Sequence, residues 1–377
     1  MQYQQFKVKL QRFIDHRAGD CLSIMLSLFA PKKQPLKNAV PASILLVKLW
    51  AVGESILTLP LLEQLKQHYP ETKIDVLTRE RNKDVYTGLP FITTVHTLEE
   101  GWKRVWSLRN KYDIAIDAEP YLNSSALLSF LVGKQTIGFT HGTRSRLYTH
   151  KIHYNDNQHV VLTYLDMARP LFNPVVPKNL VPLSTGFDDE LVTARILKEE
   201  HVKHPIIGIC TGAAESAKSR MWAKEKFVDT INYYTTKKHC HIILVGSPSE
   251  RAYNEELVHS ATLQNLVHNL AGKTTLKQLF TLIKKCDVFL SNDTGPMHIA
   301  AAQGVPTLGL FCPNTPVRFG PYGTKNKSLH KPILPHPCIN VHRREVPDCT
   351  NHDHLSKISV EDVVKELDSL LEKKKKK

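Results

Sequence analysis

The sequence predicts an α/β protein with two domains, each built around a parallel sheet. The chain has 377 residues, which is more than one hydrophobic core usually holds. Short apolar runs alternate with segments of helical periodicity in two separate series, and a proline-rich stretch near residues 173–190 lies between them. We therefore expect domains over residues 41–185 and 186–358, an N-terminal extension over 1–40, and a C-terminal helix with a lysine tail over 359–377.

The first domain begins at residue 44 with a buried strand, ILLVKLW, which is followed by a helix at residues 55–69. Three more strands are predicted by KIDVLTR, DIAIDA and QTIGF. The second domain repeats the alternation with PIIGICT, HIILVG, LVHNLAG, DVFLSND and PTLGLF. Strands that alternate with helices form parallel sheets covered on both faces, and such sheets bind ligands at the carboxyl ends of their strands.

The two ends of the chain have patterns of their own. Residues 6–30 place apolar side chains at helical spacing among lysines and arginines: Phe6, Leu10, Phe13 and Ile14. Such a segment fits either a helix lying at a membrane interface or a helix packed on the protein's own surface, and the short periodicity favours neither. Residues 30–43 then form a linker. At the other end, SVEDVVKELDSLLEK gathers apolar residues on one side of a helix, so we expect it to pack.

Charge and cysteine content limit the function classes. The formal net charge of +14 predicts attraction to phosphates, in nucleic acid, an anionic membrane or a substrate. The terminal lysines are typical of a solvated tail. Seven scattered cysteines favour a reducing compartment over a disulfide framework, and no signal peptide or spanning helix is evident. Residues 336–354 collect His and Cys at spacings that fit no standard zinc site, so no metal site is expected.

The stretch SNDTGPMHIAAAQGVP, at residues 291–306, joins a strand to a helix. Pro296 suits the first turn, whose free amides can bind a phosphate with the help of the helix dipole. Thr294 can add a hydroxyl and Gly295 lets the backbone approach closely, while the carboxylate of Asp293 suits sugar hydroxyls. A sugar diphosphate would use the whole group, and a simple helix cap by Asp293 or Thr294 is the alternative.

A second motif, GICTGAAESAKSRMWAKEKF, places polar residues after another strand. Thr211 and Gly212 open the loop, and Lys218 and Arg220 supply two cations beyond the strand end, which suits a pyrophosphate. A solvated basic loop is the alternative interpretation.

The third motif is KLWAVGESILTLP, in which Gly53 and Glu54 lie between the first strand and its helix. Glu54 either places a charge at a helix N-terminus or takes a proton from an attacking hydroxyl. The turn has neither GxGxxG nor GxxxxGK[ST], so it is no dinucleotide fingerprint and no P-loop.

These motifs resemble glycosyltransferase family nine, the lipopolysaccharide heptosyltransferases. The resemblance covers roughly residues 41–370 and is most specific over residues 291–306. It implies a GT-B fold of two facing Rossmann-like domains, with a nucleotide-diphospho-sugar donor, typically ADP-heptose, in the C-terminal domain. It also implies a lipid-linked saccharide acceptor at the N-terminal domain, and inverting, metal-independent chemistry without a cofactor.

The resemblance assigns roles to individual residues. Its donor motif matches Asp293, Thr294, Gly295, Pro296 and His298. Thr211 and Gly212 match the phosphate loop, and Glu250, in GSPSERAYNEEL, is a candidate for the ribose. Arg220 occupies the place of a lysine that commonly neutralises the leaving diphosphate. Glu54 falls where the best-known members carry an aspartate proposed as the catalytic base.

The resulting hypothesis is an inverting transfer. Glu54 deprotonates the acceptor hydroxyl, which attacks the anomeric carbon, while Lys218, Arg220 and the amides after residue 293 stabilise the departing nucleoside diphosphate. The residues assigned to the acceptor side are Gly53, Arg79, Arg81 and Arg144. These arginines either meet acceptor phosphates or are simply solvated.

Two other classes of protein are alternatives. A noncatalytic sugar-nucleotide-binding protein would make Glu54 dispensable. A nucleic-acid-binding protein is suggested by charge alone, and because no nucleic-acid motif is present, nucleic acid is not an expected partner. The basic surface and amphipathic start instead fit an enzyme at the cytoplasmic face of an anionic membrane.

Overall fold

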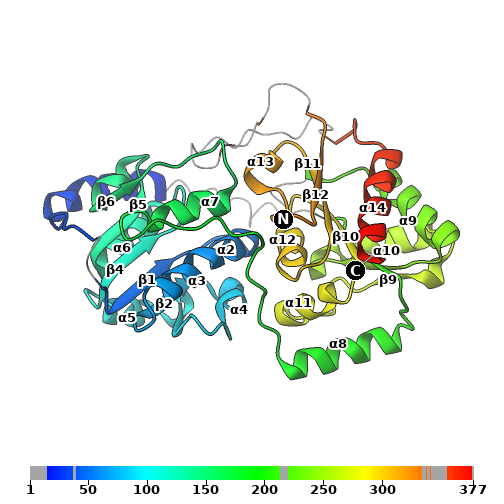
Figure 1. Ribbon diagram of the computed structural model, residues 1–377, viewed down its shortest axis with the longest axis horizontal. Coiled ribbons are helices and arrows are strands. Elements are labelled where there is room, and N and C mark those ends of the chain that lie inside the picture. The colour runs from blue at the N-terminus through cyan, green and yellow to red at the C-terminus, as the bar shows by residue number, and fades with distance from the viewer. Residues whose placement is uncertain are drawn as a thin grey trace. The chain divides into compact units, whose positions relative to one another are not determined.

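The computed structural model describes residues 15–36, 40–212, 220–332, 337, 340 and 355–375 (Figure 1). The chain divides into two compact units, one formed by the residues up to Val176 and the other by most of those from Pro177 onward. This division falls at the start of the proline-rich stretch, before the predicted boundary at residue 185. Each unit contains its own six-stranded sheet, which confirms the predicted α/β class.

The first sheet has the strand order β3-β2-β1-β4-β5-β6, and its neighbouring strands pair in parallel. The strands are β1 (Ser43–Val47), β2 (Lys73–Thr78), β3 (Thr94–Thr97), β4 (Tyr112–Asp117), β5 (Gly133–Phe139) and β6 (His150–Ile152). Chain order reverses between the neighbours β1 and β4. The crevice outside the carboxyl ends of such a pair is where doubly wound sheets bind ligands.

Helices flank this sheet in Figure 1. They are α2 (Val52–Leu57), α3 (Leu59–His68), α4 (Lys83–Tyr86), α5 (Trp102–Ser107), α6 (Asn123–Val132) and α7 (Val160–Leu165), and residues 15–26 are also helical. The helix expected over residues 55–69 is divided in two at Thr58. Pro60 lies in the first turn of α3, and a proline cannot supply the amide that would continue the preceding helix.

The second sheet has the order β12-β11-β10-β7-β8-β9, which is the arrangement of the first sheet repeated. Its strands are β7 (Ile206–Cys210), β8 (His241–Val245), β9 (Val267–Asn269), β10 (Val288–Asn292), β11 (Thr307–Phe311) and β12 (Lys327–His330). All of these strands pair in parallel. Chain order reverses between β7 and β10, so the second ligand-binding edge is expected at their carboxyl ends.

The helices of the second unit include the one predicted near the C-terminus. They are α8 (Phe187–Glu199), α9 (Lys224–Lys238), α10 (Arg251–Ser260), α11 (Leu276–Lys284), α12 (Gly295–Ala302), α13 (Pro316–Phe319) and α14 (Val360–Lys375). Val363, Leu367 and Leu370 of α14 are buried in the core of this unit. The packing expected from their spacing is therefore confirmed.

Candidate active site

A buried lysine stands at the carboxyl end of β1. Lys48 is fully buried, and its Nζ donates to Glu54 Oε2 at 2.7 Å and lies 3.4 Å from Glu119 Oε2. Burial by itself lowers the pKa of this ammonium, but the carboxylates of Glu119 and Glu54 outweigh it, and the pKa lies well above its ordinary value. Lys48 is therefore a fixed cation between two carboxylates.

Glu119 organises the loop that carries these groups. It follows β4, is fully buried, and its Oε1 accepts hydrogen bonds from the amides of Leu49 and Trp50, both at 2.6 Å. Burial raises the pKa of this carboxyl above its ordinary value, and the charge of Lys48 offsets only part of that rise. The next residue, Ala51, has a φ of 62°, a left-handed conformation that costs free energy for a residue with a Cβ. The loop is thus held in a strained shape immediately before α2.

Glu54 lies in the first turn of α2, and its side chain is 23% exposed. Its Oε2 accepts a second hydrogen bond, at 3.0 Å, from the hydroxyl of Tyr164 on α7. Gly53 is buried beside it in the same turn. The predicted base is therefore a partly exposed carboxylate at the edge where the fold binds ligands, and it accepts hydrogen bonds from the buried side chains of Lys48 and Tyr164.

The three arginines assigned to the acceptor differ in their surroundings. Arg79 pairs with Glu99 at 3.0 Å on the surface, and the guanidinium carbon of Arg81 lies 4.2 Å from the ring centroid of Trp50. Both follow β2 at the same edge of the sheet as Glu54.

Arg144 does not lie where a ligand contact was predicted. It is 1% exposed, its Nη1 donates to the carbonyl of Leu122 at 2.9 Å, and its Nη2 bonds the carbonyl of Glu119 and lies 3.4 Å from Asp117. A guanidinium is buried only when it is paired, and Asp117 supplies that pair. Arg144 is therefore a structural residue.

In the second unit, Asn292 joins the two loops at the ligand-binding edge. Its Nδ2 donates to the carbonyls of Thr211 and Gly212 at 2.8 and 3.3 Å, and its Oδ1 accepts from the amide of Trp222 at 3.2 Å. The Thr211 side chain is fully buried and its hydroxyl donates to Asn254 at 2.6 Å. Thr211 thus supports the loop with its hydroxyl already engaged.

Arg220 and Asp293 meet at this edge. Arg220 Nη1 lies 3.1 Å from Asp293 Oδ2, and the same oxygen accepts from Asn314 Nδ2 at 2.9 Å. Asp293 is 5% exposed, whereas the Arg220 side chain is 23% exposed. The cation predicted to meet the diphosphate is therefore present at the edge, paired with the carboxylate predicted to meet the sugar.

The start of α12 has the form expected of an anion-binding site. Thr294 is the N-cap residue, but its side chain makes no capping hydrogen bond to α12, and Gly295 and Pro296 form the first turn. The Thr294 hydroxyl instead bonds Ser291 Oγ at 3.1 Å. Simple capping by Thr294 is therefore not what the structure shows. His298, further along α12, is 4% exposed.

Glu250 lies against Gly212. A Cβ built on Gly212 would be 1.5 Å from Glu250 Oε1, so only glycine allows this approach. Glu250 Oε2 accepts from the amide and the hydroxyl of Ser247, at 2.7 and 2.8 Å. These contacts hold the carboxylate beside the loop that was predicted to contact phosphate.

Some predicted residues lie outside the described part of the chain, and some residues of the candidate site were not predicted from the sequence. Lys218 and the His and Cys residues of segment 336–354 lie outside the described residues. Sequence reasoning did not single out Lys48, Glu119, Tyr164 or Asn314. A lysine inside an apolar strand was the one available signal, since burial of a lysine demands a carboxylate partner.

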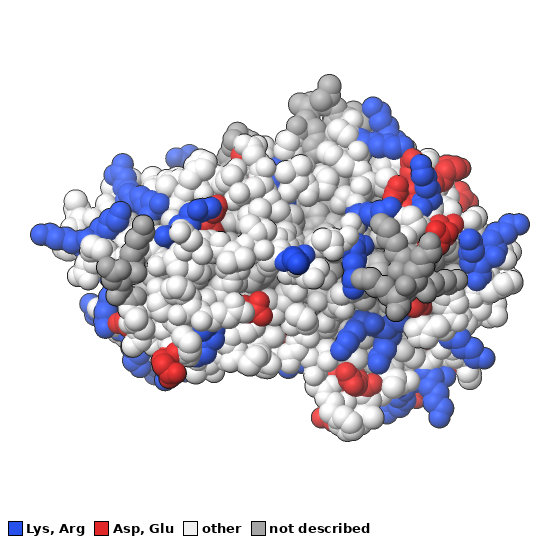
Figure 2. Space-filling model, in the orientation of Figure 1, with Lys and Arg blue, Asp and Glu red and all other residues white. Residues whose placement is uncertain are grey.

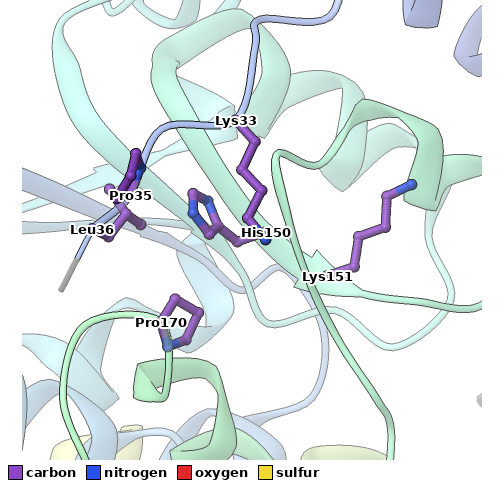
Figure 3. Close-up of a pocket in the computed structure, with 6 residues that line it drawn as sticks. All are labelled: Lys33, Pro35, Leu36, His150, Lys151 and Pro170. Carbon is purple, nitrogen blue, oxygen red and sulfur yellow. The ribbon is translucent and has the colours of Figure 1, made fainter.

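A separate cavity of about 330 Å³ opens at β6, the edge strand of the first sheet. It is lined by Lys33, Pro35, Leu36, His150, Lys151 and Pro170. In Figure 3 the side chain of Lys33 extends toward His150, while that of Lys151 extends away. Among the described residues, no helix is long and apolar enough to span a bilayer.

Two Rossmann-like sheets, one with a carboxylate and the other with an arginine and a helix start at its ligand-binding edge, are typical of glycosyltransferases of the GT-B class. The model of glycosyltransferase family 9 (heptosyltransferase) matches residues 102–347, and the chain belongs to this family. The protein is therefore an enzyme, as predicted, and the noncatalytic alternative is set aside.

Individual relatives agree with this assignment. The lipopolysaccharide core heptosyltransferase OpsX of Haemophilus influenzae is 30% identical over 304 residues, which are 76% of this chain and 84% of that protein. The structure of Escherichia coli ADP-heptose lipopolysaccharide heptosyltransferase II has a TM-score of 0.70 at 23% identity, over 88% of this chain and 99% of that one. The E. coli heptosyltransferase WaaC with ADP-2-deoxy-2-fluoro heptose has a TM-score of 0.63 at 19% identity, over 87% and 99%.

Proposed function

We propose that the enzyme transfers a heptose, with inversion, from ADP-heptose to an acceptor in the lipopolysaccharide core. The names of the relatives support the sugar, the nucleotide and the acceptor. The observation that carries the proposal is the chemistry at the two ligand-binding edges. One offers a partly exposed carboxylate, Glu54, and the other offers Arg220 beside the start of α12.

Each edge supplies one half of the reaction. Glu54 takes the proton of the acceptor hydroxyl, whose oxygen forms a bond to the anomeric carbon from the face opposite the leaving group. The bond between that carbon and the diphosphate oxygen breaks, and ADP leaves with the electron pair. The amides of the first turn of α12 and the Arg220 guanidinium stabilise the charge that develops on ADP.

The Arg220 guanidinium, which pairs with Asp293 in this structure, pairs with the donor diphosphate when the donor binds. A diphosphate at the start of α12 competes for Arg220, because a guanidinium binds two phosphate oxygens at once. Asp293 Oδ2 keeps its hydrogen bond from Asn314. Once Arg220 has moved away, the same oxygen can also accept a hydrogen bond from a sugar hydroxyl. Donor binding thus exchanges one charged pair for another.

Calorimetric titration with ADP, UDP and GDP tests the donor edge. ADP is expected to bind more tightly than the other two, and Arg220→Ala is expected to weaken ADP roughly tenfold or more, as the loss of a charge-assisted hydrogen bond does. Arg195→Ala is the matched control, because Arg195 is 70% exposed on α8 of the same unit. Equal affinity of the wild type and Arg220→Ala would contradict the assignment.

We further propose that the enzyme works at the cytoplasmic face of an anionic membrane, bound through residues 15–36. The helical part of this segment docks through small and polar residues. Asp15 accepts from the amides of Asn123 and Ser124 at 3.0 and 2.9 Å, and a Cβ on Gly19 would lie 2.5 Å from Asn123 Cβ. Ser23, one turn further along, is fully buried.

Most of the large apolar side chains of the segment are exposed, although Leu26 packs against the cluster of Ala126, Leu147 and Tyr148. Its exposed large apolar residues are Leu22, Ile24, Met25, Leu28 and Phe29, and Leu28 and Phe29 are 84% and 77% exposed. A helix packed for its own protein's stability would bury these residues instead. This arrangement favours the interfacial alternative for the described part of the segment; Phe6, Leu10, Phe13 and Ile14 lie outside the described residues.

Basic residues surround this apolar surface. Lys32 and Lys33 follow it in the sequence after two residues, and Lys33 and Lys151 border the cavity at β6. In Figure 2 Lys and Arg side chains project around this end of the first unit. Burial and the charge of Lys33 lower the pKa of His150, as expected in a basic environment. Apolar residues rimmed by lysines suit anionic lipid.

Sedimentation with phosphatidylglycerol vesicles tests this surface. Leu28→Ser with Phe29→Ser is expected to reduce vesicle binding by roughly tenfold or more, since each buried side chain contributes about 1.5–3 kcal/mol. Val175→Ser with Val176→Ser is the matched control, because those residues are also 72% and 66% exposed. Wild-type binding by the first pair, or equal loss in both pairs, would contradict this membrane surface.

A further inference from the structure

Both hydrogen bonds that Glu54 receives end on the same carboxylate oxygen. The Lys48 ammonium and the Tyr164 hydroxyl donate to Oε2, at 2.7 and 3.0 Å. Among the described residues, no donor to the other oxygen, Oε1, is found. Because the side chain is partly exposed, one oxygen is fixed to the interior and the other remains for a ligand.

The donors to Oε2 are themselves fixed. Tyr164 is fully buried on α7, and the Lys48 ammonium lies 5.6 Å from the centroid of its ring. Lys48 is buried against Glu119, which is anchored by two backbone amides of the β1–α2 loop. Together with Glu54, these three residues come from four parts of the first unit: the end of β1, α2, the segment after β4, and α7.

We infer that Lys48 and Tyr164 are positioning residues, which hold Oε2 so that Oε1 takes the proton from the acceptor hydroxyl. The inference rests on the proposed role of Glu54 as the base. The proton moves from the hydroxyl to Oε1 and later to solvent, and Lys48 and Tyr164 keep their own protons throughout. A carboxylate held in one rotamer keeps Oε1 directed at the acceptor hydroxyl. Holding reacting groups in such a geometry lowers the barrier of the reaction.

Tyr164→Phe is the direct test, with turnover of ADP-heptose and affinity for ADP as readouts. We expect kcat to fall about tenfold, as for loss of a hydrogen bond to a charged group, while ADP affinity stays unchanged. Tyr112→Phe is the matched control. Its buried hydroxyl donates to Asp75 at 2.8 Å at the amino end of β4, the other end of the same sheet, and its kcat should match the wild type.

A second variant examines Lys48. Lys48→Met alone would leave Glu119 buried without its cation, so it is combined with Glu119→Gln, whose amide oxygen can still accept from Leu49 and Trp50. The double variant loses the 2.7 Å hydrogen bond from Lys48 to Oε2, so its kcat should fall at least as far as that of Tyr164→Phe, with ADP affinity unchanged. If the double variant does not fold, Tyr164→Phe decides alone.

The outcomes separate the inference from the proposed function. An inactive Glu54→Gln together with wild-type kcat in Tyr164→Phe would overturn the positioning role and leave Glu54 as the base. Full turnover by Glu54→Gln would overturn both. Loss of turnover in Tyr164→Phe with equal loss in Tyr112→Phe would show a general structural effect, and it would also overturn the positioning role.

Discussion

Replacing Gly212 with alanine is the sharpest perturbation of the donor edge. The added Cβ would lie 1.5 Å from Glu250 Oε1 and 2.4 Å from its Cδ, far inside van der Waals contact. The backbone at Gly212 is tied to Asn292, so the Glu250 side chain has to move. The substitution therefore acts on the donor edge by displacing one carboxylate.

The size of the effect follows from what Glu250 loses. Its Oε2 gives up the hydrogen bonds from the Ser247 amide and hydroxyl. At about 0.5–1.5 kcal/mol for each bond, the free energy of unfolding should fall by roughly 1–3 kcal/mol. If Glu250 binds the ribose, ADP affinity should fall by about tenfold or more, because one hydrogen bond to a charged group is lost.

Urea unfolding and calorimetric titration with ADP measure the two effects. Glu250→Ala, alone and combined with Gly212→Ala, completes a double-mutant cycle. In the Glu250→Ala background the clash is absent, so adding Gly212→Ala should change stability by less than about 0.5 kcal/mol. Wild-type stability and ADP affinity in Gly212→Ala alone would refute the account of this loop. Equal costs of Gly212→Ala in both backgrounds would show that the clash is not with Glu250.

Two further predictions concern stability. Arg144→Met should lower the free energy of unfolding by about 3–5 kcal/mol, because it leaves Asp117 buried without its cation. Urea unfolding measures this loss. A urea midpoint near that of the wild type would contradict a structural role and favour Arg144 as an acceptor ligand. Asp362 forms a capping box with Ser359 at the start of α14 and bonds Lys331, which together hold its pKa at about 2. Asp362→Asn should therefore cost about 1 kcal/mol at neutral pH. Because the folded pKa is depressed, this cost should vanish as the pH falls through 2, and a cost that persists there would contradict the charge-based explanation.

The strands that sequence patterns predicted are those with long apolar runs, and the missed ones lie at sheet edges. Strand order places β3 and β6 at the two edges of the first sheet and β12 at an edge of the second. Their sequences, TVHT, HKI and KSLH, lack a buried apolar run because an edge strand has a neighbour on one side only. Central strands such as β1 are buried throughout and leave a clear signal.

The site was predictable where its residues are local in sequence. Asp293, Thr294, Gly295 and the loop at Gly212 follow strand ends, which a periodic pattern reveals. Tyr164 and Glu54 are 110 positions apart, so only the folded chain brings them together. Arg144 was predicted to meet the acceptor because an arginine suggests a surface position, but its burial depends on Asp117 at the end of β4, which is distant in the sequence.

The most direct test of the central claim is transfer itself. Purified enzyme is incubated with ADP-heptose and a heptose-deficient lipopolysaccharide core, and ADP release and acceptor mass are followed for the wild type and Glu54→Gln. One equivalent of ADP is expected for each heptose gained by the acceptor, and no heptose is expected to be gained with Glu54→Gln despite unchanged ADP binding. Acceptor that gains no heptose with the wild type, or gains it equally with Glu54→Gln, would contradict the proposed transfer.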